Sequence, residues 1–209
     1  MFAPGAGRFL GPPAAAAVLL FLLLIGRFAP AAAPLLALFL VVALALTAFF
    51  AVFFRDPDRV PGAGVVSAAD GRVRAVEREG DRWRISVFMN VTNVHVNRYP
   101  LDARVESVST EGSGHRPAYR TDADHNVRRA YRLATAVGPV EVVQMTGVLA
   151  RRLVSFVGVG SSGRKGDRLG MIILGSRVDV LVPAATAMPT VEVGQVVLAG
   201  TSTIARERS

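Results

Sequence analysis

The chain has 209 residues and a formal net charge of +8, but its charges are very unevenly distributed. Residues 1–54 contain only two charged side chains, Arg8 and Arg27, whereas residues 55–209 contain 22 basic and 16 acidic residues. The first part is therefore typical of a membrane segment, and the second of a water-soluble domain of common size. This division excludes a plain cytosolic enzyme, and the polar character of residues 55–209 excludes a multi-span transporter.

Residues 1–54 are predicted to anchor the protein in a membrane through one or two hydrophobic helices. The strongest apolar run before Arg27 covers residues 14–25, and the best span after it covers residues 35–54. We favour a hairpin of two spans. Two alternatives stay open: a signal peptide that ends near residues 31–33 and precedes one span, and a single span with a loosely inserted first segment.

The basic residues around this anchor predict its orientation. Arg55 and Arg59 follow the second span closely, whereas the short turn at Arg27 is less basic. By the positive-inside rule we expect a cell-membrane protein whose soluble domain lies on the cytoplasmic side. The apolar segments contain no acidic residue or histidine of the kind that marks a transport path, so we interpret them as an anchor only.

Residues 55–209 are predicted to be mainly β. Short runs rich in β-branched residues alternate with turn signals such as Asp70-Gly71 and Gly80-Asp81. The expected strands cover residues 65–66, 72–77, 83–89, 105–109, 140–145, 169–174, 178–182 and 195–199. The short spacing leaves no room for repeated crossover helices and argues against a parallel sheet. The polar stretch of residues 112–132 is expected to be a functional loop.

A weak internal echo near the C-terminus refines the expected fold. Residues 165–172 and 193–200 share a turn of the kind found in lipoyl- and biotinyl-type barrels. We therefore expect a compact barrel- or sandwich-like domain with lipoyl-like barrel features. The swinging-arm lysine of those domains is missing, because Lys165 lies before the turn. The echo thus indicates a fold and not a carried cofactor.

Composition also limits the chemistry and the partners. Cysteine is absent, which excludes disulfides, thiol catalysis and cysteine-based zinc or iron–sulfur sites, and we expect no metal. Lysine occurs once, at Lys165, so a cofactor held through a lysine has one place to attach. We expect no nucleic-acid partner, because aromatic residues are few and the chain contains no recognised nucleic-acid-binding module.

Five motifs occur in order along the chain. They cover residues 53–59, 67–71, 88–100, 144–152 and 174–179. This ordered set resembles the short-form phosphatidylserine decarboxylase proenzyme family and its archaeal relatives, whose expected substrate is archaetidylserine. The resemblance extends from about Phe53 to the C-terminus, and the hydrophobic N-terminus fits it. Five motifs in the right order are far more specific than any one of them.

The resemblance implies a self-processing enzyme. Members of the family cleave themselves between a glycine and a serine, here Gly175 and Ser176. The serine hydroxyl attacks the preceding carbonyl to form an ester, and elimination and hydrolysis leave a pyruvoyl group on the new N-terminus. Glycine suits this position because it tolerates unusual backbone angles. The products, residues 1–175 and 176–209, would stay together as a heterodimer, with a higher oligomer left open.

The pyruvoyl group would serve as the electron sink for decarboxylation of a serine-headed phospholipid to its ethanolamine form. The usual alternative is pyridoxal phosphate, but Lys165 is the only lysine and lacks the required fold context. Phosphatidylserine and archaetidylserine both stay open as substrates, because the reacting serine head is the same. The alternative function is a non-catalytic, membrane-tethered β-barrel module that retains the decarboxylase fold.

The family motifs also assign catalytic residues. Asp70 matches an Asp-Gly motif whose acid belongs to a self-cleavage triad, although Asp-Gly is also a common hairpin turn. His95 matches the histidine of the central motif and is expected to protonate the product. Longer members carry a second histidine where this chain has Arg98. The base for self-cleavage therefore stays open between His95 and two histidines of the polar stretch, His115 and His125.

Three residues are predicted to bind the substrate. Asn126 and Arg128 lie in a stretch that resembles a family Asn-Glu-Arg sequence, although Val127 replaces the acidic residue. Together with Arg98, they are expected to bind the lipid phosphodiester or carboxylate through charge-assisted hydrogen bonds. A solvated basic loop is the alternative interpretation of residues 125–129.

Overall fold

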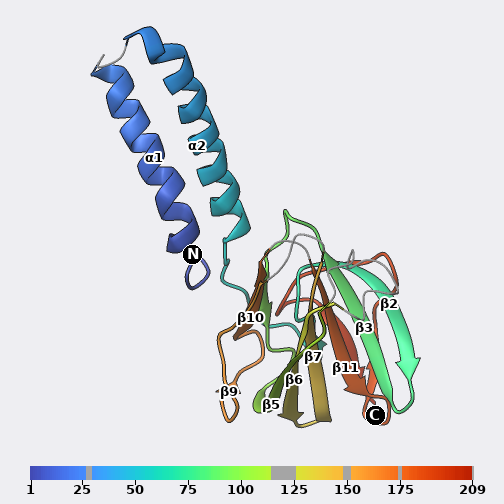
Figure 1. The fold of residues 1–209 in the computed structure, drawn as a ribbon. Coiled ribbons are helices and arrows are strands. Elements are labelled where there is room, and N and C mark those ends of the chain that lie inside the picture. Colours follow the sequence, from blue (N-terminus) through green and yellow to red (C-terminus); the bar gives the residue numbers. More distant parts are fainter. Residues whose placement is uncertain (27–29, 114–125, 148–151, 174–175, 209) are drawn as a thin grey trace. The chain divides into compact units, whose positions relative to one another are not determined.

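The computed structural model divides the chain into two compact units, Met1–Pro57 and Asp58–Ser209 (Figure 1). The structure describes residues 1–26, 30–113, 126–147, 152–173 and 176–208. The first unit is helical and the second consists of strands, so the boundary lies close to the change in charge density at Arg55.

The helical unit contains two apolar helices. Helix α1 covers Gly7–Ile25, and helix α2 covers Ala33–Phe53 directly after the short 3-10 turn η1, Pro30–Ala32. By length and composition both helices can cross a membrane. The α1 helix of 19 residues corresponds to about 28 Å, close to the thickness of a bilayer's hydrocarbon core.

The two helices pack antiparallel to each other. Near the start of α1, the ring of Phe9 stacks on Phe54 with a centroid distance of 4.8 Å and lies 6.1 Å from the ring of Phe50. Beyond the helices, the backbone N–H of Ala3 donates to the carbonyl of Phe54 at 2.8 Å. The chain therefore forms the helical hairpin that the first interpretation of the sequence requires. Its insertion in a membrane stays a prediction.

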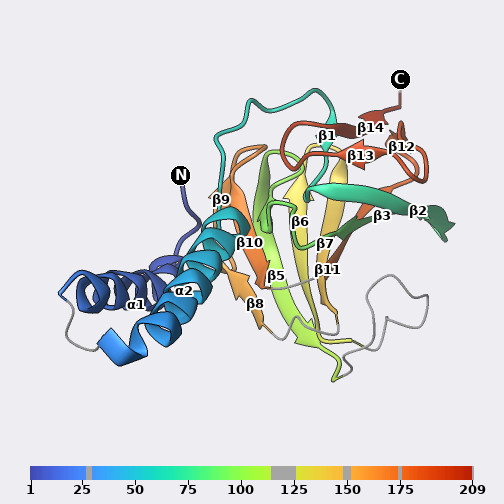
Figure 2. The ribbon, with the colours of Figure 1, turned by 90° about the horizontal axis from the view of Figure 1, so that it is seen from above.

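The second unit is built from antiparallel strands in three sheets (Figure 1). The eight-stranded sheet has the order β13-β2-β3-β11-β7-β6-β5-β9, and the two three-stranded sheets have the orders β4-β10-β8 and β1-β14-β12. Figure 2 shows β1, β12, β13 and β14 gathered close to the C-terminus. The strands are β1 Val65–Val66, β2 Gly71–Glu79, β3 Arg82–Met89, β4 Val96–Arg98, β5 Ala103–Glu111, β6 Arg128–Thr135, β7 Gly138–Thr146, β8 Arg152–Ser155, β9 Ser162–Gly163, β10 Arg168–Ile173, β11 Ser176–Pro183, β12 Ala187–Pro189, β13 Val196–Val197 and β14 Thr203–Glu207.

The mainly β prediction is confirmed, with 43% strand and 23% helix, but the sheets are open and do not close into barrels. The two outer strands of the large sheet, β9 and β13, are each only two residues long and do not pair with each other. Closing a barrel requires its first and last strands to form a hydrogen-bonded ladder. The sequence left a barrel-like and a sandwich-like domain open, and the open sheets show that this domain is not a closed barrel.

Every strand expected from the sequence overlaps an observed strand, but the expected polar loop of residues 112–132 is partly wrong. Residues 114–125 lie outside the described residues, and β6 begins at Arg128 and pairs with both β5 and β7. The arginines of β6 form cross-strand ion pairs: Arg128 lies 3.0 Å from Glu111, and Arg132 lies 3.1 Å from Glu106. These pairs explain why a strand with one solvated face has the composition of a loop.

Strand β11 lies inside the large sheet, between β3 and β7. Its alternate residues Val178, Val180 and Val182 are fully buried in the core. On the opposite face, Arg177 binds Asp179 through two hydrogen bonds, Nε to Oδ1 at 2.9 Å and Nη2 to Oδ2 at 2.8 Å. The core therefore holds this strand from one side, and a buried ion pair stiffens the other.

Both segments of the internal echo contain a glycine in the left-handed region. Gly166 has φ of 87° just before β10, and Gly194 has φ of 94° just before β13. The neighbouring Lys165 donates its Nζ to the carbonyl of Gly64 at 3.3 Å. The repeated turn is therefore real, and the lysine that precedes it is a structural contact of the loop.

Candidate active site

The register of the large sheet places Ser176 in a row of residues at one end of the strands. Ser176 lies opposite Met89 of β3 on one side and opposite Thr146 of β7 on the other. The backbone N–H of Thr146 donates to the carbonyl of Val127 at 3.0 Å, which extends the row toward β6. Gly175 lies outside the described residues. The predicted cleavage position is thus next to the first residue of a strand that is paired on both sides.

On the far side of β3, the row continues to Gly71. Its φ of +151° is a conformation that side chains rarely adopt, and an added Cβ would lie 2.1 Å from the carbonyl oxygen of Phe88. Only glycine therefore allows β2 to start this close to β3. The preceding Asp70 lies at the same end of the sheet as Ser176, with β3 between them.

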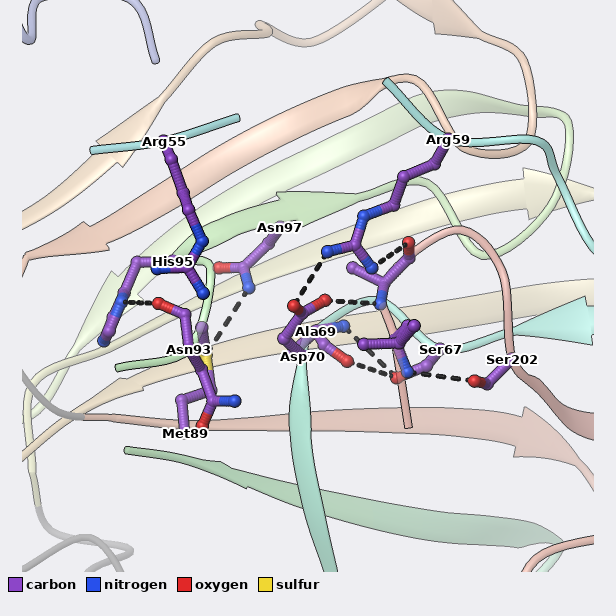
Figure 3. A network of polar contacts seen from close by, with 12 residues as sticks. Arg55, Arg59, Ser67, Ala69, Asp70, Met89, Asn93, His95, Asn97 and Ser202 are labelled. Atoms are coloured by element: carbon purple, nitrogen blue, oxygen red, sulfur yellow. Dashed lines mark hydrogen bonds and ion pairs between the residues drawn. The ribbon is translucent and has the colours of Figure 1, made fainter. Parts of the chain in front are cut away.

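Asp70 is a buried and fully engaged carboxylate (Figure 3). Its Oδ1 accepts a hydrogen bond from the backbone N–H of Ala199 at 2.8 Å, and its Oδ2 pairs with Nη2 of Arg59 at 2.8 Å. The other guanidinium nitrogen of Arg59 donates to the carbonyl of Ala199 at 3.2 Å. Within the described chain, Asp70 therefore pairs with Arg59 and the C-terminal segment rather than with a histidine.

His95 is buried directly before β4. Its Nδ1 lies 2.9 Å from the carbonyl oxygen of Asn93, and a dashed line marks this contact in Figure 3. A carbonyl only accepts hydrogen bonds, so Nδ1 carries the proton and Nε2 is the ring nitrogen that can accept one. The carbonyl of His95 accepts from the N–H of Ile172 at 3.2 Å, three residues before Gly175. This bond fixes His95 beside the strand that leads to the predicted cleavage position.

The structure separates the three predicted substrate-binding residues. Asn126 is buried, and its Nδ2 donates to the carbonyl of Thr146 at 2.7 Å, beside the row that contains Ser176. Arg98 is also buried and donates Nη1 to the carbonyl of Gly166 at 2.8 Å, in one turn of the internal echo. Arg128 instead lines a cleft of about 310 Å³ that also contains Arg84 and Asp179. His115 and His125 lie outside the described residues.

A buried chain of side-chain hydrogen bonds was not expected from the sequence. Tyr131 of β6 donates its hydroxyl to Oε1 of Gln144 of β7 at 3.2 Å, and Gln144 donates Nε2 to Oδ1 of Asn97 of β4 at 2.7 Å. The Nδ2 of Asn97 faces the Sδ of Met89 at 3.8 Å (Figure 3). The only signal in the sequence was a glutamine at the position where alternation from the valines of β7 predicts a core residue.

This chain of hydrogen bonds from Tyr131 to Asn97 is shielded from solvent. Burial raises the pKa of Tyr131 above its ordinary value, although hydrogen bonds with Ser155 and Arg129 oppose the shift. Its hydroxyl therefore keeps its proton and remains a donor. Gly170 of β10 covers the chain closely, since an added Cβ would lie 2.9 Å from Nε2 of Gln144 and 3.0 Å from the hydroxyl of Tyr131.

Among the residues that the structure describes, no cluster of three or more histidines and carboxylates could hold a metal. The polar groups described above are instead an imidazole, side-chain amides and a carboxylate bound to an arginine. Such a site suits proton transfer and hydrogen bonding to oxygen.

The comparisons with known proteins agree on one family. A family model described as phosphatidylserine decarboxylase matches residues 46–205. A Halobacterium salinarum protein named "Putative archaetidylserine decarboxylase proenzyme" is 49% identical over 170 residues, which cover 79% of this chain and 85% of that protein. The phosphatidylserine decarboxylase proenzyme of Thermobifida fusca is 46% identical over 166 residues, covering 78% of this chain and 76% of its own. The phosphatidylserine decarboxylase proenzyme of Streptomyces avermitilis is 41% identical over 169 residues, which cover 80% of this chain and 78% of that protein.

Proposed function

The chain belongs to the phosphatidylserine decarboxylase family, and we propose that it is a pyruvoyl-dependent enzyme that first cleaves itself between Gly175 and Ser176. The mature enzyme would convert phosphatidylserine or archaetidylserine to the corresponding ethanolamine lipid. The observation that carries this proposal is the register of Ser176 at the start of β11, at the sheet end that also contains Asp70 and Thr146.

Self-cleavage requires the Ser176 hydroxyl to attack the carbonyl carbon of Gly175. A C–O bond forms, the C–N bond of the peptide breaks, and the released nitrogen takes up a proton. Elimination then removes the Cα proton of residue 176 and breaks its Cβ–O bond, which frees the carboxylate of Gly175. Water hydrolyses the resulting unsaturated N-terminal residue, releasing ammonia and leaving the pyruvoyl group. Strand pairing on both sides supports this step, because β3 and β7 hold residue 176 after the chain is cut.

The residues around position 176 fit a pyruvoyl group. Its two adjacent carbonyl oxygens accept hydrogen bonds, and the buried polar side chains of this unit include the amides of Asn97 and Asn126 and the imidazole of His95. Once formed, the group supplies a carbonyl electron sink for the electron pair that remains when carbon dioxide leaves. Lys165, the only lysine, donates to the carbonyl of Gly64 in a loop, which gives no support to pyridoxal phosphate.

We assign the proton transfers of decarboxylation to His95. Its Nδ1 is oriented by the carbonyl of Asn93, so Nε2 is the nitrogen that gains and delivers a proton. Asp70 is our candidate acid for self-cleavage. To orient a histidine it would first have to release Arg59, so Asp70→Asn should slow self-cleavage whereas Arg59→Met should not.

We propose that Asn126, Arg98 and Arg128 contribute to binding of the lipid head group. Asn126 is supported by its position beside Thr146, and Arg128 by its place in a charged cleft. The two apolar helices would hold the enzyme in the cell membrane, with the catalytic unit on the cytoplasmic side, where its water-insoluble substrate lies. The working protein would be a heterodimer of residues 1–175 and 176–209.

Denaturing mass spectrometry of the purified full-length protein tests self-cleavage. We expect two fragments, the smaller one starting at residue 176 and blocked to Edman sequencing. Ser176→Ala should give one intact chain and no decarboxylation, whereas Ser162→Ala, at an exposed strand serine, should behave like the wild type. A single intact 22.1 kDa chain under turnover conditions would favour the alternative, a non-catalytic membrane-tethered module.

Substrate choice needs a separate measurement. The purified enzyme is mixed with detergent-dispersed phosphatidylserine or archaetidylserine, and the ethanolamine lipid is quantified by mass spectrometry. His95→Ala should lower turnover of both lipids. Unchanged turnover in that variant would show that our assignment of His95 is wrong.

A further inference from the structure

The buried chain Tyr131–Gln144–Asn97 connects two different sheets. Tyr131 and Gln144 belong to β6 and β7 of the large sheet, whereas Asn97 belongs to β4 of the three-stranded sheet β4-β10-β8. Gln144 is two residues before Thr146, the partner of Ser176. Asn97 is two residues after His95. The hydrogen bond from Gln144 to Asn97 therefore joins the strand next to the predicted cleavage position to the strand that follows the catalytic histidine.

The direction of the hydrogen bonds in this network follows from its Met89 end. At one end, the thioether of Met89 can only accept, so the amide of Asn97 must present Nδ2 to it and turn Oδ1 toward Gln144. Gln144 then donates Nε2 to Asn97 and turns Oε1 toward the hydroxyl of Tyr131. One consistent orientation of both amides therefore satisfies the chain, which makes it a directional link and not a general polar contact.

The link is also tightly enclosed. Tyr131, Gln144 and Asn97 are each completely buried. Gly170, the partner of Asn97 in β10, has no side chain at the place where a Cβ would press on Gln144 and Tyr131. A buried and fully connected network specifies one arrangement of the elements that it joins, because any shift leaves a buried polar group without a partner.

We propose that Tyr131, Gln144 and Asn97 are positioning residues that fix β4, and with it His95, relative to residue 176. This inference rests on the proposed function, because it assigns the link to the reaction at that site. A displacement of about 1 Å at a reacting group can reduce a rate by about 100-fold. Loss of the link should therefore slow self-cleavage and lower kcat per processed chain, whereas KM should stay nearly the same because all three side chains are completely buried.

The test uses full-length protein variants and three measurements: the half-time of self-cleavage, kcat and KM per mole of processed chain, and the pH dependence of kcat. Gln144→Met keeps the volume of the side chain but removes the donor to Oδ1 of Asn97 and the acceptor of the Tyr131 hydroxyl. Tyr131→Phe removes the hydroxyl that donates to Gln144, together with its hydrogen bonds with Ser155 and Arg129. We expect about 10- to 100-fold lower kcat for Gln144→Met, a smaller loss for Tyr131→Phe, and a shifted pH profile in both.

Tyr99→Phe is the matched control. Tyr99 is another buried tyrosine of the same core, and its hydroxyl has no hydrogen-bond partner within the described chain. The Tyr99→Phe variant should cleave itself and decarboxylate its substrate like the wild type. If Gln144→Met and Tyr131→Phe stay within twofold of Tyr99→Phe in all three measurements, the positioning role is refuted.

A double variant separates positioning from stability. Replacing both partners of a buried hydrogen bond by apolar groups restores much of the stability that a single replacement loses. The melting temperature of the double variant Asn97→Leu, Gln144→Met should therefore lie closer to that of the wild type than the melting temperature of Gln144→Met does. Its kcat should stay low, because apolar contacts do not fix the orientation of β4. Recovery of kcat together with the melting temperature would mean a purely structural role. Failure of wild-type protein to cleave itself would instead overturn the proposed function.

Discussion

Arg59 and Asp70 form a buried ion pair in which Nη2 lies 2.8 Å from Oδ2, and the two side chains are only 9% and 4% exposed. Among the described residues, Arg59→Met would leave the buried carboxylate with the backbone N–H of Ala199 as its one donor. We expect the free energy of unfolding to fall by about 3–5 kcal/mol, the usual result of removing one partner of a buried pair. Urea denaturation monitored by circular dichroism measures this change in the free energy of unfolding.

The control for this prediction is a solvent-exposed pair of the same type. Arg132 and Glu106 lie 3.1 Å apart and are 62% and 46% exposed. Arg132→Met should therefore cost less than about 1 kcal/mol. Equal destabilisation by the two substitutions would contradict a structural role for the Arg59 pair.

The surroundings of Gly71 and Gly80 lead us to expect different outcomes when each glycine is changed to alanine. At Gly71 an added Cβ would lie 2.1 Å from the carbonyl oxygen of Phe88, whereas at Gly80, with φ of +60°, it would meet nothing within 4 Å. Gly71→Ala should lower the free energy of unfolding by about 3–5 kcal/mol and stop self-cleavage, because β2 must move away from β3. Gly80→Ala should cost about 1–2 kcal/mol and leave processing intact. The urea midpoints and a denaturing gel check both results.

The apolar surface of α2 should determine membrane retention. Val41 and Leu44 are 63% and 53% exposed in the helical unit. Changing both to arginine should raise the free energy of membrane insertion by about 2.5–3.5 kcal/mol per residue at the centre of the helix. We expect the protein to shift from the membrane pellet to the supernatant after alkaline carbonate extraction. Val60→Arg, at a residue outside the helices that is 83% exposed, should stay in the pellet like the wild type.

Two buried tyrosines predict a loss of stability in alkaline solution. Burial raises the pKa of Tyr99, to which the charge of Asp167 adds, and burial likewise raises the pKa of Tyr131. In the unfolded chain both ionise near their ordinary pKa of about 10. Their stabilising effect is therefore complete below pH 10 and is lost as the pH rises toward the folded-state values.

Urea denaturation between pH 8 and pH 11 checks the alkaline effect. The free energy of unfolding should decrease above about pH 10, and the decrease should be smaller in Tyr99→Phe. An unchanged pH dependence in that variant would mean that the phenol of Tyr99 does not contribute.

Local sequence patterns predicted much of this fold, because alternation and turn residues act over only a few positions. The runs around Val178 and Val142 gave strands with the correct buried face, and the charge-poor first 54 residues gave two helices. The arginine-rich strand β6 was taken for a loop because its partners, Glu106 and Glu111, are supplied by another strand. The choice between a barrel and a sandwich stayed open at this stage, since a local turn motif does not determine how the outer strands pair.

The site was predictable to the extent that it is encoded in contiguous motifs. Such motifs identified Ser176, His95 and Asp70 as candidates, but not the partners that hold them. The carboxylate of Asp70 binds Ala199, a residue 129 positions away, and Gln144 binds Asn97 across 47 positions. These contacts arise from register and from the packing of one sheet on another, which single residues do not reveal.

The position of β11 between β3 and β7 has a thermodynamic consequence. The small chain that starts at Ser176 would supply an inner strand of the large sheet, so the mature protein could unfold fully only by separating into two molecules. Processing would thus change unfolding from a first-order reaction into a dissociation. The melting temperature of the mature enzyme should rise with protein concentration, whereas that of an uncleaved precursor should not.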